Sequence, residues 1–89
     1  APDWLNSRLD TLNTLHSRET LTRWKQLAND RRWHELVSEL LQQHYDPLYQ
    51  RSQGSHFTGL EAPRRFATDD LSPAGIEALA RQIVAAEPT

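Results

Sequence analysis

The chain has 89 residues, a formal net charge of −2 and no cysteine. This length allows one domain at most, which would bury roughly 60–65% of the surface that its unfolded form exposes. The lack of cysteine excludes disulfide scaffolds, thiolate zinc sites and cysteine nucleophiles, and the near-neutral charge argues against a protein held on nucleic acid by bulk charge alone.

Two amphipathic helices are expected at the start of the chain. Apolar residues at helical spacing predict a first helix over about 3–16, with a stripe made of Trp4, Leu5, Leu9, Leu12 and Leu15. Ser17 is placed to cap a second helix. Its apolar stripe consists of Leu21, Trp24, Leu27 and Ala28.

A third helix carries the clearest periodicity in the sequence. Asn29 and Asp30 end the second helix, and Asp30 is expected to cap the third. Apolar residues then recur at i, i+3, i+4, i+7 and i+8, namely Trp33, Leu36, Val37, Leu40 and Leu41. We expect the tryptophans of all three helices to lie in the core.

The segment HYDPLYQRS, residues 44–52, is expected to be a helix junction. The residue before a proline is steered away from helical dihedrals, so the third helix should end near Tyr45. Asp46 would then be the N-cap of a short helical turn, with Pro47 at its first position and Leu48 and Tyr49 inside it.

The last third of the chain contains one well-marked helix. The stretch RRFAT could form a short strand near 64–67, although it would need a partner. Ser72 is an expected N-cap, Pro73 an expected first helical residue, and Leu71 can pack on Ile76. The predicted stripe is Ile76, Leu79, Ala80, Ile83 and Val84, and Pro88 ends the pattern.

The predicted fold is therefore mainly α, with four or five short amphipathic helices packed as a small bundle. Its expected parts are a helical region at 1–59, a linker or short strand at 60–71, and a C-terminal helix at 72–87. The chain begins APDW and contains no methionine, so we expect it to be a piece of a longer polypeptide. No apolar run approaches the ~18 residues of a membrane span, which favours a cytoplasmic protein.

No self-sufficient active site is visible in the sequence. The histidines His16, His34, His44 and His56 include no i, i+4 pair and no HExxH pattern, so no metal site is expected. No phosphate-binding GxxxxGK[ST] loop is present. Ser52 or Ser55 with His56 would make a weak hydrolase hypothesis, because closeness in sequence alone does not build a nucleophile and base.

Residues 44–65 form the strongest candidate binding region. Arg51, Arg64 and Arg65 are accompanied there by only two acids, Asp46 and Glu61. Tyr49 and His56 lie among them, and aromatic rings together with guanidinium groups suit contacts to phosphates or bases. In the alternative interpretation, the two tyrosines of the junction fill the core, and Arg51 pairs with an acid and only orders the loop.

The junction also carries a family resemblance. The segments RLDTL, TRWKQLA and WHELVSELLQQHYDPLYQRS are similar to the C-terminal region of bacterial tRNA 2-selenouridine synthases. In that family a leucine-rich helix leads into a Tyr-Asp-Pro-x-Tyr motif, represented here by residues 45–49. The resemblance covers roughly residues 8–57, and the tail agrees in the order of its elements more than in its residues.

The resemblance implies a role in tRNA modification. The family replaces sulfur by selenium in the wobble 2-thiouridine of tRNA, with selenophosphate as co-substrate, through a rhodanese-like domain with a catalytic cysteine and a P-loop domain. Neither the cysteine nor the P-loop lies in these residues, so the resemblance implies a noncatalytic segment without a cofactor, whose partners are tRNA and the rest of the polypeptide. The alternative is a free-standing helical protein–protein interaction module, whose apolar stripes would bind the partner.

Overall fold

A computed structural model describes residues 1–52, 57–58, 72–85 and 87–88, and for residues 49, 51–52, 57–58 and 87–88 it describes the backbone only. The described chain is mainly helical, as predicted. In chain order its elements are α1 (Asp3–Thr11), α2 (Arg18–Asn29), α3 (Trp33–Leu40), the π-helical turn η1 (Leu41–Tyr45), α4 (Asp46–Ser52), β1 (Phe57–Thr58), α5 (Pro73–Ala85) and β2 (Glu87–Pro88).

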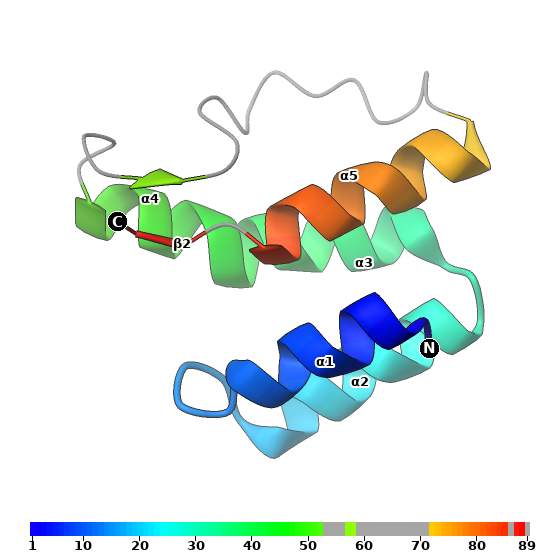
Figure 1. The fold of residues 1–89 in the computed structure, drawn as a ribbon, viewed down its shortest axis with the longest axis horizontal. Coiled ribbons are helices and arrows are strands. Elements are labelled where there is room, and N and C mark those ends of the chain that lie inside the picture. Colours follow the sequence, from blue (N-terminus) through cyan, green and yellow to red (C-terminus); the bar gives the residue numbers. More distant parts are fainter. Residues whose placement is uncertain (53–56, 59–71, 86, 89) are drawn as a thin grey trace.

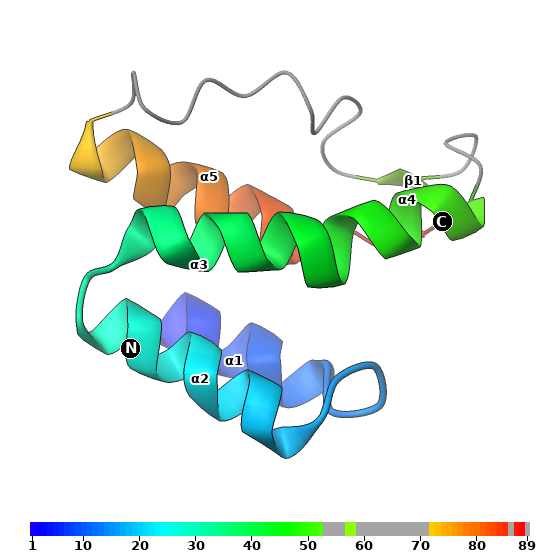
Figure 2. The same cartoon turned by 180° about the vertical axis from the view of Figure 1, so that it is seen from behind.

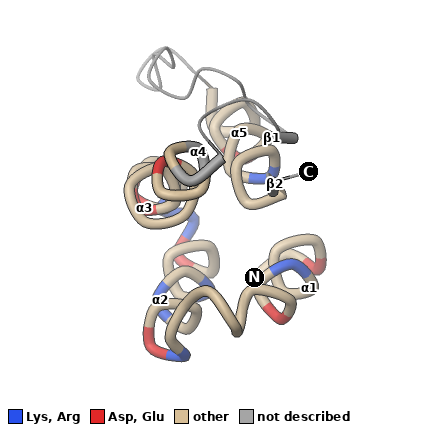
Figure 3. Tube along the Cα trace, turned by 90° about the vertical axis from the view of Figure 1, so that its left-hand side faces the viewer, with Lys and Arg blue, Asp and Glu red and all other residues tan. Residues whose placement is uncertain are grey.

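The helices are arranged in two layers (Figures 1 and 2). The antiparallel pair α1 and α2 forms one layer, and α3 and α5 form the other. Seen end-on, these four helices occupy the corners of a bundle, and charges of both signs are mixed along α1 and α2 (Figure 3). None of the helices that the structure describes is both long and apolar enough to cross a membrane.

The space between the layers is filled by the predicted apolar stripes. One continuous core is built from residues of α1, α2, α3, η1 and α5, including the fully buried Trp24 and Tyr45. All four predicted stripe residues of α2 and all five of α5 are buried. Trp33 is 8% exposed and stacks on the half-buried Trp4, with ring centroids 6.2 Å apart. The tryptophans therefore belong to the core or its edge, as predicted.

The first helix is shorter than the predicted range of 3–16. α1 ends at Thr11, and a turn closed by bonds from the Leu15 and His16 amides to the Leu12 carbonyl leads to α2. Leu15, placed on the buried stripe by its spacing, is instead 47% exposed. The periodicity of the leucines continues past the point where the chain must turn back to bring α2 against α1.

The two ends of α2 illustrate one correct prediction and one wrong one. Ser17 is the N-cap, and its hydroxyl accepts a 3.2 Å bond from the Thr20 amide. Asp30 does not cap α3; it is the C-cap of α2. The Arg31 amide bonds the Ala28 carbonyl, and the Arg32 amide bonds that of Leu27.

These two bonds form a Schellman motif, which places the residue after the C-cap in the left-handed region. That residue is Arg31, with φ of 58°. The chain leaves the motif at Arg32, which is the N-cap of α3 and makes no side-chain cap bond. The carboxylate of Asp30 instead accepts a bond from Gln26 one helical turn earlier.

The predicted junction is present as a boundary, since η1 ends at Tyr45 and the short helix α4 begins at Asp46, but the chain is not interrupted there. The helix continues from Trp33 to Ser52 through η1, and Asp46 has helical dihedrals (φ −59°, ψ −45°) rather than those of an N-cap. Pro47 cannot donate to the carbonyl four residues earlier, and its ring would clash there. A π turn precedes the proline, in which the Asp46 amide donates to the Leu41 carbonyl, five residues back.

α5 begins as predicted, with Pro73 as its first residue and a 3.1 Å bond from the Gly75 amide to the Ser72 hydroxyl. It packs along α3, so the C-terminal helix shares the core of the preceding helical region. The pairing of Phe57 with Pro88 and of Thr58 with Glu87 was not predicted. The strand expected at 64–67 and the contact of Leu71 with Ile76 lie outside the described residues.

Candidate functional site

The residues predicted to contact tRNA belong to two parts of the chain. Tyr49 and Arg51 lie on α4, whose backbone is described. Arg64, Arg65 and His56 lie outside the described residues. α4 extends beyond the end of the α1–α2 layer as a continuation of the α3 rod (Figures 1 and 2). Tyr49 and Arg51 are therefore carried on a helix that projects past the core and is anchored in it through η1.

The Tyr-Asp-Pro motif forms the anchor of that helix. The Tyr45 side chain is fully buried in the core, and Leu48 is 5% exposed. Asp46 and Pro47, between them, are half-buried and helical. The extra residue in the π turn brings Tyr45 to the core side beside His44, whereas an uninterrupted α-helix would rotate Tyr45 away from the stripe. Tyr45 thus anchors the helix in the core, and Asp46 has helical dihedrals instead of the extended ones of an N-cap.

A pair of histidines joins the two layers next to this anchor. Nε2 of His16, in the turn between α1 and α2, lies 3.0 Å from Nδ1 of His44 on η1. His44 is 1% exposed and His16 is half-buried. The two ring centroids are 5.2 Å apart, close to the nitrogen–nitrogen distance plus the two ring radii. The nitrogens therefore face each other directly, as hydrogen-bonded rings do.

The surroundings of His16 make its charged form unfavourable. Its ring packs edge-on against Trp24, with centroids 4.8 Å apart. Burial lowers the pKa of the His16 imidazole below its ordinary value of 6.5, because the cation loses hydration. The open side of the ring borders a surface pocket of about 480 Å³ whose charged lining residues are Asp10, Arg18 and Lys25. Asp10 and Lys25 form a 3.4 Å ion pair with each other.

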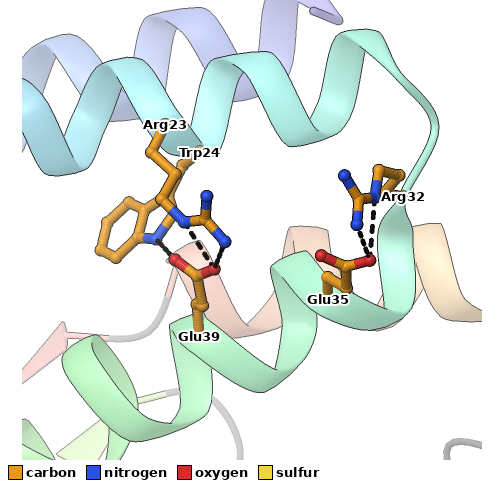
Figure 4. A network of polar contacts seen from close by, with 5 residues as sticks. All are labelled: Arg23, Trp24, Arg32, Glu35 and Glu39. Carbon is orange, nitrogen blue, oxygen red and sulfur yellow. Dashed lines mark hydrogen bonds and ion pairs between the residues drawn. The ribbon is translucent and has the colours of Figure 1, made fainter.

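A second polar contact between the layers is centred on Glu39 of α3 (Figure 4). Its Oε1 accepts a 3.2 Å bond from the indole Nε1 of Trp24, and its Oε2 accepts a 2.8 Å bond from Nε of Arg23. The hydrogen bond to Glu39 raises the pKa of the Arg23 guanidinium. Glu39 is mostly buried, with 17% of its side chain exposed, whereas Arg23 is 58% exposed. Glu39 therefore fixes the buried tryptophan from one side and holds a surface arginine from the other.

The histidine pair was missed from the sequence because the two residues are 28 positions apart. One signal did exist. His44 follows Leu40 by four residues and Leu41 by three, so it continues the apolar stripe of the third helix and should be buried. Nothing local in the sequence indicates that His16 would meet it. Within the part of the chain that the structure describes, no group of three or more His, Cys, Asp or Glu residues could hold a metal ion.

Comparison with known proteins gives no match: no family model, curated protein or solved structure is significantly similar to the chain. The resemblance to tRNA 2-selenouridine synthases therefore rests on the segments quoted above, chiefly the Tyr-Asp-Pro-Leu-Tyr motif at residues 45–49.

Proposed function

We propose that the chain is a noncatalytic helical segment of a cytoplasmic tRNA 2-selenouridine synthase-like enzyme, in which it packs against the rest of the polypeptide and contacts tRNA. The observation that carries the proposal is the placement of the family-like motif. Residues 45–49 span the point where a buried helix leaves the core and continues as α4. In the proposal, tRNA contacts this helix, which carries Tyr49 and Arg51 in its sequence.

The burial of the apolar stripes favours this hypothesis over a protein–protein interaction module. In that alternative the stripes would be available to a partner. The described stripe residues instead pack against one another in one core, and the only large hydrophobic side chain exposed among the described residues is Leu15. A single exposed leucine is ordinary for a small protein and does not make an interaction surface.

The tRNA contact is tested by the salt dependence of binding. Each arginine that engages a phosphate releases counterions and adds roughly 0.7–0.9 to the slope of log affinity against log salt. Arg51→Ala/Arg64→Ala/Arg65→Ala should therefore weaken binding of a thiolated tRNA and flatten that slope. Fluorescence anisotropy at several KCl concentrations measures both quantities.

A matched control separates specific contacts from net charge. Arg18, Arg31 and Arg81 are exposed elsewhere on the bundle, and their replacement by alanine removes the same charge. This control should keep most of the slope. A folded Arg51/Arg64/Arg65 variant with an unchanged slope would remove these arginines from the tRNA surface and leave Arg51 a role in ordering the loop. Incubated with selenophosphate and thiolated tRNA, the chain alone should leave the tRNA unmodified, because it has neither the cysteine nor the P-loop.

A further inference from the structure

The His16–His44 contact ties the turn between α1 and α2 to η1, across the boundary between the two layers. A hydrogen bond between two imidazoles needs one N–H donor and one nitrogen with a free lone pair. The direct approach of the two nitrogens, 3.0 Å apart, leaves room for one proton between them. A chelated metal ion would instead need both lone pairs to converge on a third point.

Counting protons shows when this bond can exist. With both rings neutral, one ring donates and the other accepts. With one ring charged, the imidazolium donates to the neutral ring, and the bond persists as a charge-assisted one. With both rings charged, two N–H groups and two positive charges face each other in a site where His44 is 1% exposed. The bond is then lost, and repulsion replaces it.

Charged groups of both signs lie on the elements that pack around the pair. They come from every neighbouring element: α1 contributes Asp10 and Arg8, α2 contributes Arg18 and Lys25, α3 contributes Glu39, α4 contributes Asp46, and α5 contributes Glu77 and Arg81. Asp10 is paired with Lys25, and Glu39 is paired with Arg23. On α5, Glu77 lines a different pocket, beside Trp33, and Arg81 lies over the Trp4 ring. Arg8 bonds the Val84 carbonyl.

We propose that His16 and His44 form a pH-sensitive latch that holds the α1–α2 turn on η1 at neutral pH and releases it in acid, when both rings are protonated. The unfolded chain binds a proton on each ring near the ordinary value of 6.5, whereas the latched state excludes at least one of them. The contribution of the latch to folding stability is therefore present above about pH 6.5, and it is lost progressively as the pH falls below that value. The folding equilibrium constant should fall by up to about tenfold per pH unit for one excluded proton.

The test replaces each imidazole by an amide that does not titrate. The amide of a glutamine reaches about as far as Nε2 of histidine, and that of an asparagine about as far as Nδ1, so His16→Gln and His44→Asn can keep the hydrogen bond. The matched control is His34→Gln, which removes an exposed histidine from α3. Urea unfolding between pH 7 and 5 should show a steep loss of stability in the parent and in His34→Gln. That loss should be much smaller in His16→Gln and in His44→Asn.

A second measurement reads the latch in the parent protein itself. The ring ¹⁵N signals of the two histidines should titrate together, with coupled apparent midpoints of which at least one lies below 6.5. Backbone amide signals of residues 12–16 and 41–45 should shift over the same pH range. A parent in which the two rings titrate independently at ordinary values would overturn the latch. So would a folded His16→Gln variant that loses stability between pH 7 and 5 as steeply as the parent.

Discussion

The indole Nε1 of Trp24 donates a hydrogen bond to Oε1 of Glu39, which joins the α1–α2 layer to α3. Trp24 is fully buried and Glu39 mostly so. Glu39→Leu should destabilise the protein by about 1–3 kcal/mol, the range for leaving a buried donor without its acceptor. Trp24→Phe in the same background removes the stranded donor, so the double variant should be more stable than the sum of the single changes predicts.

The Arg23–Glu39 ion pair provides the control for that cycle. Arg23 is largely exposed, so its coupling to Glu39 should be weaker and should shrink in high salt, while the Trp24–Glu39 coupling should not. Chemical denaturation of the two double-mutant cycles at 0.1 and 1 M NaCl makes the comparison. Equal, salt-sensitive coupling for both pairs would show that the indole bond contributes nothing of its own.

Trp33 is expected to anchor the start of α3. It is 8% exposed and stacks on Trp4, so Trp33→Ala should cost about 3–5 kcal/mol through lost burial and the cavity left behind. Leu15→Ala, at an exposed leucine, should change stability by only about 0.5 kcal/mol or less. Thermal melts of both variants test this prediction. A Trp33→Ala protein as stable as the parent would contradict the core assignment.

The N-cap of α2, Ser17, can be compared with Asp30, which the sequence suggested as the cap of α3 but which does not cap that helix. Ser17→Ala should destabilise the protein by about 0.5–2 kcal/mol, because the Thr20 amide loses its acceptor. Asp30→Ala should have a smaller effect, because the exposed Asp30 carboxylate only bonds the Gln26 side chain. Urea unfolding at pH 7 measures both. A larger loss for Asp30 than for Ser17 would contradict the assignment of the two helix ends.

Arg31 occupies a position that favours glycine. With φ of 58° it is the one described non-glycine residue in the left-handed region. Arg31→Gly should stabilise the chain by about 0.5–1 kcal/mol, the balance of relieved Cβ strain and greater entropy in the unfolded state. Arg31→Ala, which keeps a Cβ and loses the same charge, should show no such gain. A glycine variant that melts below the alanine variant would exclude the strain argument.

Local patterns in the sequence determined most of the helices. The stripes of α2 and α5, and four of the five stripe residues predicted for the third helix, are buried as their spacing predicts, because a helix that is apolar on one side must cover that side; Leu41 is half-buried. The caps Ser17 and Ser72 were also predictable, since a cap involves residues only three positions apart. The candidate tRNA residues Arg51, Arg64 and Arg65 remain a prediction from composition and from the resemblance.

Tertiary structure decided the features in which several local rules compete. Pro47 and Asp46 signal a helix end, but the burial of Tyr45 and Leu48 stabilises one continuous helix with a π turn at the conflict. The leucine pattern of α1 continues through Leu15, yet the chain turns at Leu12 so that α2 can pack beside α1. The His16–His44 contact depends on the turn after α1, because that turn brings the His16 ring to His44, which continues the buried stripe of α3. Local sequence patterns cannot predict such a contact, because the two segments are brought together only by the packing of the two layers.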